Sequence, residues 1–373
     1  MDLRLCKNHS ERRSILEKET GVSLSTIGEI YTDDPSIVHC ENLIGSISLP
    51  LGVAGPLRIQ GEHLQDTVYL PLATTEGALV ASVNRGCKAI LASGGVQVQI
   101  QNVGATRGPV FRTQGIQEGK KLMQWIETHF TLLKQEAKTT SSHLDLLKVH
   151  MQMNGTEVYV RFDFDTEEAM GMNMATIATD KIVKIIEKEC NVCCIAVAGN
   201  YDIDKKPAWL NMISGRGKRG WAEILMSRDN VESILKTTPE KIEEIVRVKC
   251  WGGSMMAGSL GFNAHFANIV AAFYAATGQD LAHVVEGSHG VTSARLLPDG
   301  DLYFSIMMPA LMIGMVGGGT KLKTQREAQS LTKAKTAIEL AEVLVGGVLA
   351  GELSLIASIS AQSLANVHKS LGR

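Results

Sequence analysis

Polar and charged positions dominate the first 44 residues of the chain, and short apolar runs broken by glycine and proline follow them. A helical period within residues 10–19 predicts a small helical segment over residues 1–44. Beyond it, Gly55 and Pro56 punctuate the apolar runs, which predicts strands joined by turns. We expect the main domain to begin at residue 45.

An alanine-rich apolar run marks the first long helix. It starts after Thr74 and Thr75 and ends before Gly94, a pattern typical of a helix with a threonine cap at its start and a glycine stop. After residue 207 the chain is predicted to be predominantly helical. The helices expected there cover residues 254–276, 325–345 and 351–371.

The stretch between residues 100 and 197 has a different pattern. Alternating runs such as QVQIQ and EVYVRFDF predict strands, with helical patterns at 116–136 and 167–189 and a last apolar strand at 193–198. We therefore predict an α+β fold. A small sheet-containing domain, residues 100–197, is inserted into a larger, mainly helical domain formed by residues 45–99 and 198–373.

Composition excludes several classes of protein for this 373-residue chain. Hydrophobic residues make up 45% and charged residues 20%, a globular balance, and a net charge of −2 gives no overall attraction to nucleic acid or anionic membrane. Seven cysteines without paired CxxC spacing predict reduced thiols and no metal site. The N-terminus shows no signal region, and Glu352 and glycines interrupt the apolar stretch 341–360. We expect a buried helix there and a soluble, cytoplasmic protein without a membrane anchor.

A literal GxGxxG motif at residues 215–220, GRGKRG, raises the question of a dinucleotide site. A Rossmann fingerprint should follow a strand and open a helix, whereas this motif follows LNMIS and holds three cations. We therefore interpret it as a basic turn.

Residues 167–173, EEAMGMN, are a better candidate for binding a dinucleotide. At a helix N-terminus, free N–H groups and the positive end of the dipole favour a phosphate, and Met170 and Met172 could contact a ring. Packing of these methionines in a core explains them equally well. Gly317 and Gly318 are open to two readings of the same kind, a mobile turn or a backbone approach to a ligand.

Charged residues that could carry chemistry are scattered along the chain. Glu76, at the start of its helix, is either a charge on the helix dipole or a proton donor facing a cleft. Asp280 fits a loop cap, and His368 fits a solvated histidine near the chain end. Lys205 and Lys206 in GNYDIDKKP differ, because adjacent cations repel unless anions lie nearby. The pair suggests a site for a carboxylate or an oxyanion, although two surface lysines would need no such explanation.

Taken together, the motifs of residues 41–373 resemble those of 3-hydroxy-3-methylglutaryl-CoA (HMG-CoA) reductases of class I, the class shared by eukaryotes and archaea. The matching segments follow the family's order: ENLIGSISLPLGVAGPL, TTEGALVASVNRGCKAI, EEAMGMNM, GNYDIDKKP with GRGK, GSLGFNAHFANIV with GQD, GMVGGGT and AGELSL. The resemblance implies reduction of HMG-CoA to mevalonate and CoA with two NADPH, as in the mevalonate pathway of isoprenoid biosynthesis. It also implies a ferredoxin-like, non-Rossmann dinucleotide domain inserted in the substrate domain. A homodimer or higher homo-oligomer with shared sites is implied too, so that Glu76 and Lys205 can come from different subunits.

The resemblance assigns four catalytic roles. Lys205 would hold the oxyanion of the thioester carbonyl, and Asp280 would tune Lys205. Glu76 would protonate the aldehyde oxygen, and His368 would protonate the departing CoA thiolate.

Binding roles are implied in the same way. Asn84 and Arg85 would face CoA, while the hydroxymethylglutaryl group would meet Asn200, Asp204, Lys206, Lys249 and Asn268. The cofactor would contact Ser142, His143, Glu168, Met170, Gly171, Met172, Asn173, Gly317, Gly318 and Arg373.

Several positions depart from the family pattern. Gln99 and Ala198 stand where an arginine and a serine are usual, which weakens the hold on the substrate carboxylate and leaves the lysines to carry it. His143 and Glu168 replace an arginine and an aspartate, so NADH remains an alternative to NADPH. The departures keep two other functions open: a catalytically silent relative that binds acyl-CoA, and a reductase of a related acyl-CoA thioester.

Overall fold

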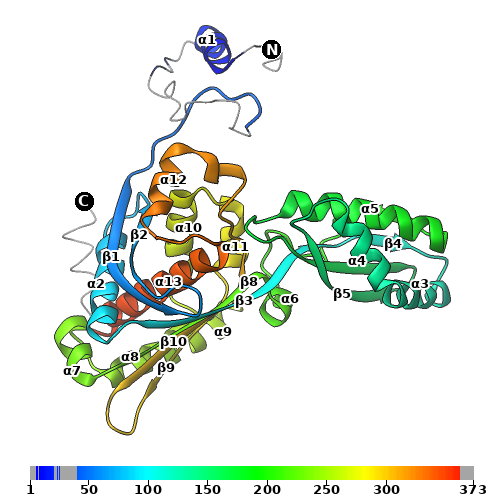
Figure 1. Ribbon diagram of the computed structural model, residues 1–373. Helices are drawn as coiled ribbons and strands as arrows, with labels where there is room; N and C mark the ends of the chain where they lie inside the picture. The colour runs from blue at the N-terminus through cyan, green and yellow to red at the C-terminus, as the bar shows by residue number, and fades with distance from the viewer. Residues whose placement is uncertain (1–5, 7, 21–22, 24, 26–39, 362–373) are drawn as a thin grey trace.

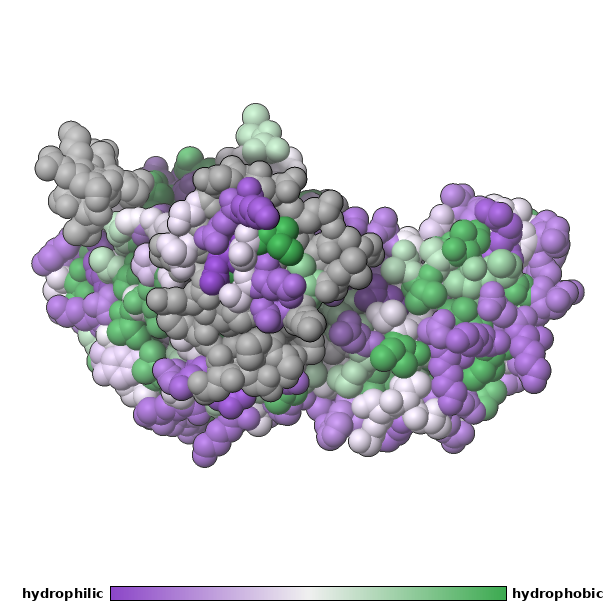
Figure 2. All heavy atoms as spheres, turned by 90° about the horizontal axis from the view of Figure 1, so that it is seen from above, coloured by the Kyte–Doolittle hydropathy of each residue, from purple (hydrophilic) through white to green (hydrophobic). Residues whose placement is uncertain are grey.

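Two bodies of unequal size, joined by the long strand β3 (Val96–Arg107), make up the described part of the chain (Figure 1). This computed structural model describes residues 6, 8–20, 23, 25 and 40–361. Each body has its own hydrophobic core. Seen from above, a waist at which hydrophilic residues are visible separates the two bodies (Figure 2). The predicted mixture of helices and sheet is confirmed.

A ten-stranded sheet runs through both bodies. Seven strands follow the order β7-β4-β6-β3-β8-β10-β9, and β1, β2 and β5 pair outside this path. Strand β3 links the two bodies, because it pairs antiparallel with β8 (Arg216–Met226) and, through its last residues, with β6 (Glu157–Asp165). The other strands of the larger body are β1 (Leu51–Gly61), β2 (Thr67–Ala73), β9 (Val291–Leu296) and β10 (Leu302–Leu311).

The prediction of a predominantly helical chain after residue 207 missed β8, β9 and β10. The GRGKRG stretch, which we interpreted as a basic turn, forms the start of β8, and its Arg216 and Lys218 are buried. Such a polar run does not have the alternation of a strand, and pairing with β3 and β10 provides the partners for its backbone.

One 24-residue helix, α13 (Ala337–Ser360), runs through the larger body (Figure 1). A capping box between Thr336 and Glu339 starts it. The helix is long and apolar enough to cross a membrane, but 83% of its most apolar window is buried inside the protein. The buried helix is therefore confirmed, whereas the predicted break before residue 351 is wrong. Gly351 lies inside the helix, where a Cβ would collide with the side chain of Ile269.

The helix predicted to start after Thr74 and Thr75 begins later than expected. Helix α2 (Leu79–Ala92) has Ala78 at its N-cap in the left-handed conformation and no side-chain cap, so the predicted threonine cap is wrong. The hydroxyl of Thr74 instead accepts from the backbone N–H of Glu76 at 3.0 Å. The helices expected at 254–276 and 325–345 are interrupted by loops. Their helical parts are α9 (Ser254–Met256), α10 (Phe266–Thr277) and α12 (Lys323–Ser330), with α13 beginning at Ala337.

The described residues outside the smaller body also form several shorter helices. They are α1 (His9–Thr20), α6 (Trp209–Ser214), α7 (Arg228–Asn230), η4 (Val231–Leu235), α8 (Pro239–Ile245), η5 (Val246–Gly253), η6 (Leu281–His283), α11 (Val284–Gly287) and η7 (Gly318–Lys321).

The smaller body follows the order strand, helix, strand, strand, helix, strand. The helix predicted over residues 116–136 is divided at His129, and the last strand is shorter than predicted. Four antiparallel strands lie in the order β7-β4-β6-β5. The elements are β4 (Val110–Arg112), α3 (Ile116–Thr128), α4 (Phe130–Lys138), β5 (Asp145–Asn154), β6, α5 (Met172–Cys190) and β7 (Cys193–Ala196).

Candidate functional site

The loop between β7 and α6 carries both predicted lysines on a strained backbone. Asn200, Ile203 and Lys205 have positive φ angles of 63°, 52° and 56°. This region costs energy for residues with a side chain, most of all for a β-branched isoleucine. Such a backbone persists because its surroundings hold it. The hydroxyl of Thr106 on β3, for example, donates to the carbonyl oxygen of Asp202 at 2.6 Å.

The fold brings Lys205 into contact with Asp280. Lys205 Nζ lies 2.7 Å from Asp280 Oδ2, and the two side chains are 38% and 36% exposed, so a substrate can reach them. Asp280 also accepts from the N–H of Ala282 at 3.0 Å, as a loop cap would. Partial burial acts to raise the pKa of Asp280, but the hydrogen bonds from Lys205 and Ala282 outweigh it and hold the pKa below its ordinary value. Asp280 is therefore a carboxylate at neutral pH.

Lys206 and Lys249, the two cations predicted to hold the substrate carboxylate, are exposed. Lys206 follows Lys205 in the loop, and Lys249 lies on η5. Neither side chain forms an ion pair within residues 40–361. Both ammonium groups are therefore available to an anion.

A buried charge network lies behind the pair, formed by Arg216, Asp204, His283 and Glu286. The guanidinium of Arg216 donates to the Glu286 carboxylate and, at 3.0 Å, to Asp204 Oδ1. Asp204, which was predicted to contact substrate, thus directs its carboxylate towards Arg216 and not towards the lysines. Burial lowers the pKa of Arg216, and the carboxylates of Glu286 and Asp204 oppose that shift.

His283 and Glu286 connect this network to Asp280. His283 Nδ1 lies 2.7 Å from Glu286 Oε1, and its Nε2 lies 3.7 Å from Asp280 Oδ2. The side chains of His283 and Glu286 are fully buried. The ligand atoms of Asp204, His283 and Glu286 fall within 4.8 Å of one another, a spacing that can suit a metal ion. The guanidinium of Arg216 already supplies positive charge to both carboxylates, so we interpret the cluster as an ion-pair network.

Sequence reasoning missed three members of the buried charge network. Arg216 was placed in a basic turn, and its burial on β8 could not be read from the motif. His283 and Glu286 are three residues apart, the spacing of neighbours on one helix face, and this was the available signal.

Glu76 and Asn268 form a second contact between predicted residues. The amide of Asn268, on α10, donates to Glu76 Oε1 at 3.2 Å. Glu76 is exposed and precedes α2, so it does not occupy the first turn of the helix as predicted. Asn268 was expected to orient Lys205 or the substrate oxygen, and the structure places it beside Glu76.

Asn84 and Arg85 both lie on α2. The side-chain oxygen of Asn84 accepts from the N–H of Gly55 at 3.0 Å. The guanidinium of Arg85 donates to Ser354 and Ser358 on α13, and its burial lowers its pKa. Arg85 therefore ties α2 to the end of α13, while Asn84 is more exposed.

Two of the predicted cofactor segments pack against each other. The carbonyl oxygen of Glu168 accepts from the N–H groups of Met315 at 2.7 Å and Val316 at 3.2 Å. The Glu168 carboxylate accepts from the N–H of Ala337 at the start of α13. This contact sets the glycine run of Gly317 and Gly318 beside the N-terminus of α5. The two segments far apart in sequence thus form one surface.

The backbone in these segments leaves room for a ligand. Gly171 is the N-cap of α5 with φ of 87°, and Gly317 and Gly318 have φ of 92° and 53°. A Cβ added at either of the last two would have no neighbour within 4 Å. Free N–H groups at a helix start next to open glycines suit a phosphate-bearing ligand.

Side chains around the start of α5 divide between surface and core. Asn173, Ser142 and His143 are exposed, while Met170 is half-buried and Met172 is buried. The core reading therefore holds for Met172, whose sulfur lies 3.0 Å from Arg216 Nη2. His143 Nδ1 lies 2.6 Å from Glu167 Oε2, so the residue that replaces the usual arginine is paired with a carboxylate.

The remaining positions singled out in the sequence are Gln99, Ala198, His368 and Arg373. Gln99 is exposed on β3 and lines a cavity of about 450 Å³ with Arg58 and Gln60. Ala198 is exposed in the loop before Asn200. His368 and Arg373 lie outside the described residues.

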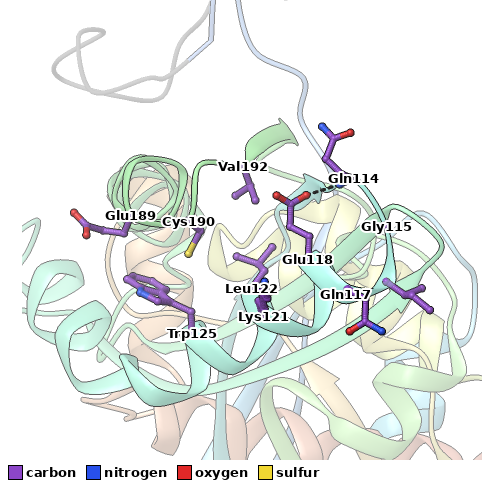
Figure 3. Close-up of a pocket in the computed structure, with 11 residues that line it drawn as sticks. Gln114, Gly115, Gln117, Glu118, Lys121, Leu122, Trp125, Glu189, Cys190 and Val192 are labelled. Atoms are coloured by element: carbon purple, nitrogen blue, oxygen red, sulfur yellow. Dashed lines mark hydrogen bonds between the residues drawn. The ribbon is translucent and has the colours of Figure 1, made fainter.

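A larger cavity, of about 610 Å³, lies in the smaller body between α3 and the end of α5. Figure 3 shows Leu122 and Trp125 from α3 near Cys190 and Val192. Burial raises the pKa of the Cys190 thiol to about 11, so it is a weak nucleophile. None of the predicted site residues lines this cavity.

Comparison with known proteins gives a consistent result. The family model described as "Hydroxymethylglutaryl-coenzyme A reductase" matches residues 8–373. The 3-hydroxy-3-methylglutaryl-coenzyme A reductase of Pyrococcus abyssi is 48% identical over 374 residues, covering 97% of this chain and 92% of that protein. The enzyme of the same name from Methanocaldococcus jannaschii is 44% identical, with 97% and 92% covered.

A solved structure supports the fold. It is the class II 3-hydroxy-3-methylglutaryl-CoA reductase from Streptococcus pneumoniae bound to NADPH in open conformations, with a TM-score of 0.70 and 17% identity. The match covers 95% of this chain and 97% of that one.

Proposed function

This chain belongs to the hydroxymethylglutaryl-coenzyme A reductase family, and on that premise we propose that it reduces HMG-CoA to mevalonate and CoA with two NADPH. One observation carries the proposal: Lys205 Nζ lies 2.7 Å from Asp280 Oδ2, on a strained loop at a solvent-accessible position. An ammonium group held in this way can meet the oxygen on which negative charge develops when a thioester carbonyl is reduced.

The residues divide the proton and charge work of the reaction. Lys205 stabilises the oxyanion of the thioester-derived hemithioacetal, and Asp280 keeps Lys205 in place. When the hemithioacetal collapses, the CoA thiolate needs a proton, which we assign to His368 in the segment outside the described residues. Glu76, held by Asn268, is assigned to protonate the aldehyde oxygen in the second reduction. Lys206 and Lys249 are assigned to the distal carboxylate.

The cofactor fits the surface formed by the α5 N-terminus and the open glycines Gly317 and Gly318. Two NADPH molecules, bound one after the other, would supply one hydride each. Gly171 and the first N–H groups of α5 would hold its phosphates, and Met170 and Asn173 would line the adjoining surface. His143, together with Ser142, is assigned to the 2′-phosphate, with Arg373 joining from outside the described residues.

Finer features of the fold belong to the same proposal. The smaller body's order of elements and its strand order β7-β4-β6-β5 are those of a ferredoxin-like unit, which supports a non-Rossmann cofactor domain. Its separate core supports an inserted domain at residues 100–197 within 45–99 and 198–373. The archaeal relatives support class I, and we propose a cytoplasmic enzyme.

A homodimer is proposed on the basis of exposed apolar residues at the N-terminal edge of the larger body. Ile47 is 87% exposed, and Leu49, Leu51 and Val53 are exposed beside it. An apolar strip of this kind is typical of a surface that another copy covers. Light scattering after size exclusion would give the mass, and a monomer at all concentrations would contradict the proposal.

The decisive experiment is a parallel assay of NADPH and NADH oxidation by the purified protein. We expect oxidation of NADPH only when HMG-CoA is present, and loss of at least about 100-fold in kcat for Lys205→Ala. Lys184→Ala, on the exposed face of α5, is the matched control and should retain full activity. Tight HMG-CoA binding without oxidation of either cofactor would instead support a silent acyl-CoA-binding relative. A higher kcat/KM for a thioester without the distal carboxylate would support the other alternative.

A further inference from the structure

His283 lies between the carboxylates of Asp280 and Glu286, and the proposed reaction assigns it no role. It ends η6, one turn after Asp280, and it precedes Glu286 on α11 at the junction of the two bodies (Figure 1). Its side chain is fully buried, and its Nε2 has no hydrogen-bond partner in the described structure. A buried ring nitrogen without a partner costs free energy unless it has a purpose or gains a partner.

The orientation of the His283 ring follows from its contact with Glu286. Nδ1 lies 2.7 Å from Glu286 Oε1, which only accepts, and 3.4 Å from Arg216 Nη1, which only donates. The much shorter contact with Glu286 assigns a proton to Nδ1. Nε2 therefore faces Asp280 Oδ2 at 3.7 Å, the same oxygen that binds Lys205 Nζ. With a neutral ring, two acceptors would face each other. A second proton, on Nε2, converts this contact into an attraction between an imidazolium and the carboxylate.

The charges around the ring favour that second proton. Three carboxylates, those of Asp204, Asp280 and Glu286, face His283, against the cations Arg216 and Lys205. One negative charge is thus left over, and an imidazolium balances it.

Other titratable neighbours do not change this balance. Arg107 pairs with Asp202 at 3.2 Å and lies 4.0 Å from Asp204, so Arg107 and Asp202 together add one charge of each sign. Burial raises the pKa of Tyr274 on α10 and lowers the pKa of His289, so both are neutral near pH 7.

We propose that His283 is a positioning residue that, in its doubly protonated form, holds the Asp280 carboxylate against Lys205. The inference rests on the proposed function, because it assigns His283 to the ion pair that would stabilise the oxyanion. Glu286 is the anchor on the other side: besides His283, it accepts from Arg216 and from the backbone N–H of Lys205 at 3.4 Å. Glu286 therefore holds Lys205 through its backbone N–H and Asp280 through His283.

The test compares three chains: the unsubstituted protein, His283→Ala and His283→Gln. The alanine variant should lose about 10- to 100-fold in kcat at neutral pH with the KM for HMG-CoA nearly unchanged, as expected when a group that positions a functional residue is removed. The glutamine variant can still donate an N–H towards Asp280 but does not titrate. It should retain most of kcat, and its kcat should fall less than that of the unsubstituted protein as the pH is raised above neutrality.

Two results would overturn the proposal: full kcat in His283→Ala, or an unchanged alkaline fall in His283→Gln. If the alanine variant does not fold, as judged by circular dichroism, the pH profile of the glutamine variant decides.

A readout independent of turnover separates this inference from the proposed function. In protein labelled with ¹⁵N-histidine, the resonance that vanishes in His283→Gln identifies His283. We expect its nitrogens to show the signature of a protonated ring at neutral pH, and Asp280→Asn to shift them towards the neutral ring. A neutral ring in the unsubstituted protein would contradict the role of His283 even if HMG-CoA is reduced. Conversely, a protonated ring in a protein that does not oxidise NADPH would contradict only the proposed function.

Discussion

The Lys205–Asp280 contact and the Glu76–Asn268 contact are built in different ways. Behind Lys205 and Asp280 lies a buried charge network that fixes both residues from one side. Glu76 is exposed and is held by one side-chain hydrogen bond from Asn268, at 3.2 Å. The proton-donor role proposed for Glu76 is favoured where water is excluded, and the exposed position of Glu76 does not exclude water. Within the described residues, the Lys205–Asp280 contact has a buried support that the Glu76–Asn268 contact lacks.

The largest effect is expected from breaking the buried network itself. Glu286→Gln leaves Arg216 without the charge of its fully buried partner, and removal of one member of a buried pair typically costs about 3–5 kcal/mol. Chemical denaturation should show this loss in the free energy of unfolding. Glu240→Gln, which breaks an exposed ion pair with Arg228, is the control and should change stability little. Equal losses in the two variants would show that the network does not support the site.

Asp280→Asn should impair catalysis more than stability. Without the carboxylate, Lys205 loses its partner, and we expect kcat to fall by about 100-fold while the protein stays folded. The pKa of Asp280 is lowered in the folded protein. Its contribution to stability is therefore present above the ordinary pKa and is lost as pH falls through the lowered value. In acid titrations followed by circular dichroism, the variant should lack this part of the decline.

Asn268→Ala tests the second contact and should have a smaller effect. Loss of one exposed hydrogen bond is expected to reduce kcat by about threefold to tenfold, with no measurable change in unfolding. Asn268→Asp, which places two carboxylates side by side, should be worse than alanine. If alanine reduced kcat as much as Asp280→Asn does, the two contacts would be equivalent and the comparison would fail.

The smallest effect is expected at His143. An arginine there could bind a 2′-phosphate with two N–H groups, so His143→Arg should raise the preference for NADPH over NADH by about threefold. The ratio of kcat/KM for the two cofactors measures this. Lys148→Arg, on β5, provides a control with a similar change of chemistry. A shift of the ratio towards NADH would show that this part of the surface does not meet the phosphate.

Local patterns in the sequence determined much of the secondary structure and the family. The apolar stretch near 341–360 identified a buried helix, the alternating runs identified β3 and β6, and the ordered motifs identified the relation to HMG-CoA reductases. These signals are local, because periodicity and short motifs are properties of neighbouring residues.

The resemblance implied the contact of Asp280 with Lys205, but only the tertiary structure decided the charge pairs behind it. Asp204, adjacent to that lysine in sequence, pairs with Arg216. Arg216 itself looked like part of a basic turn and is buried on β8, because strand pairing with β3 and β10 carries it into the interior. Burial and ion pairing depend on segments that are far apart in the chain. The sequence therefore predicted Lys205 as a functional residue, whereas the buried charge network that holds it was visible only in the fold.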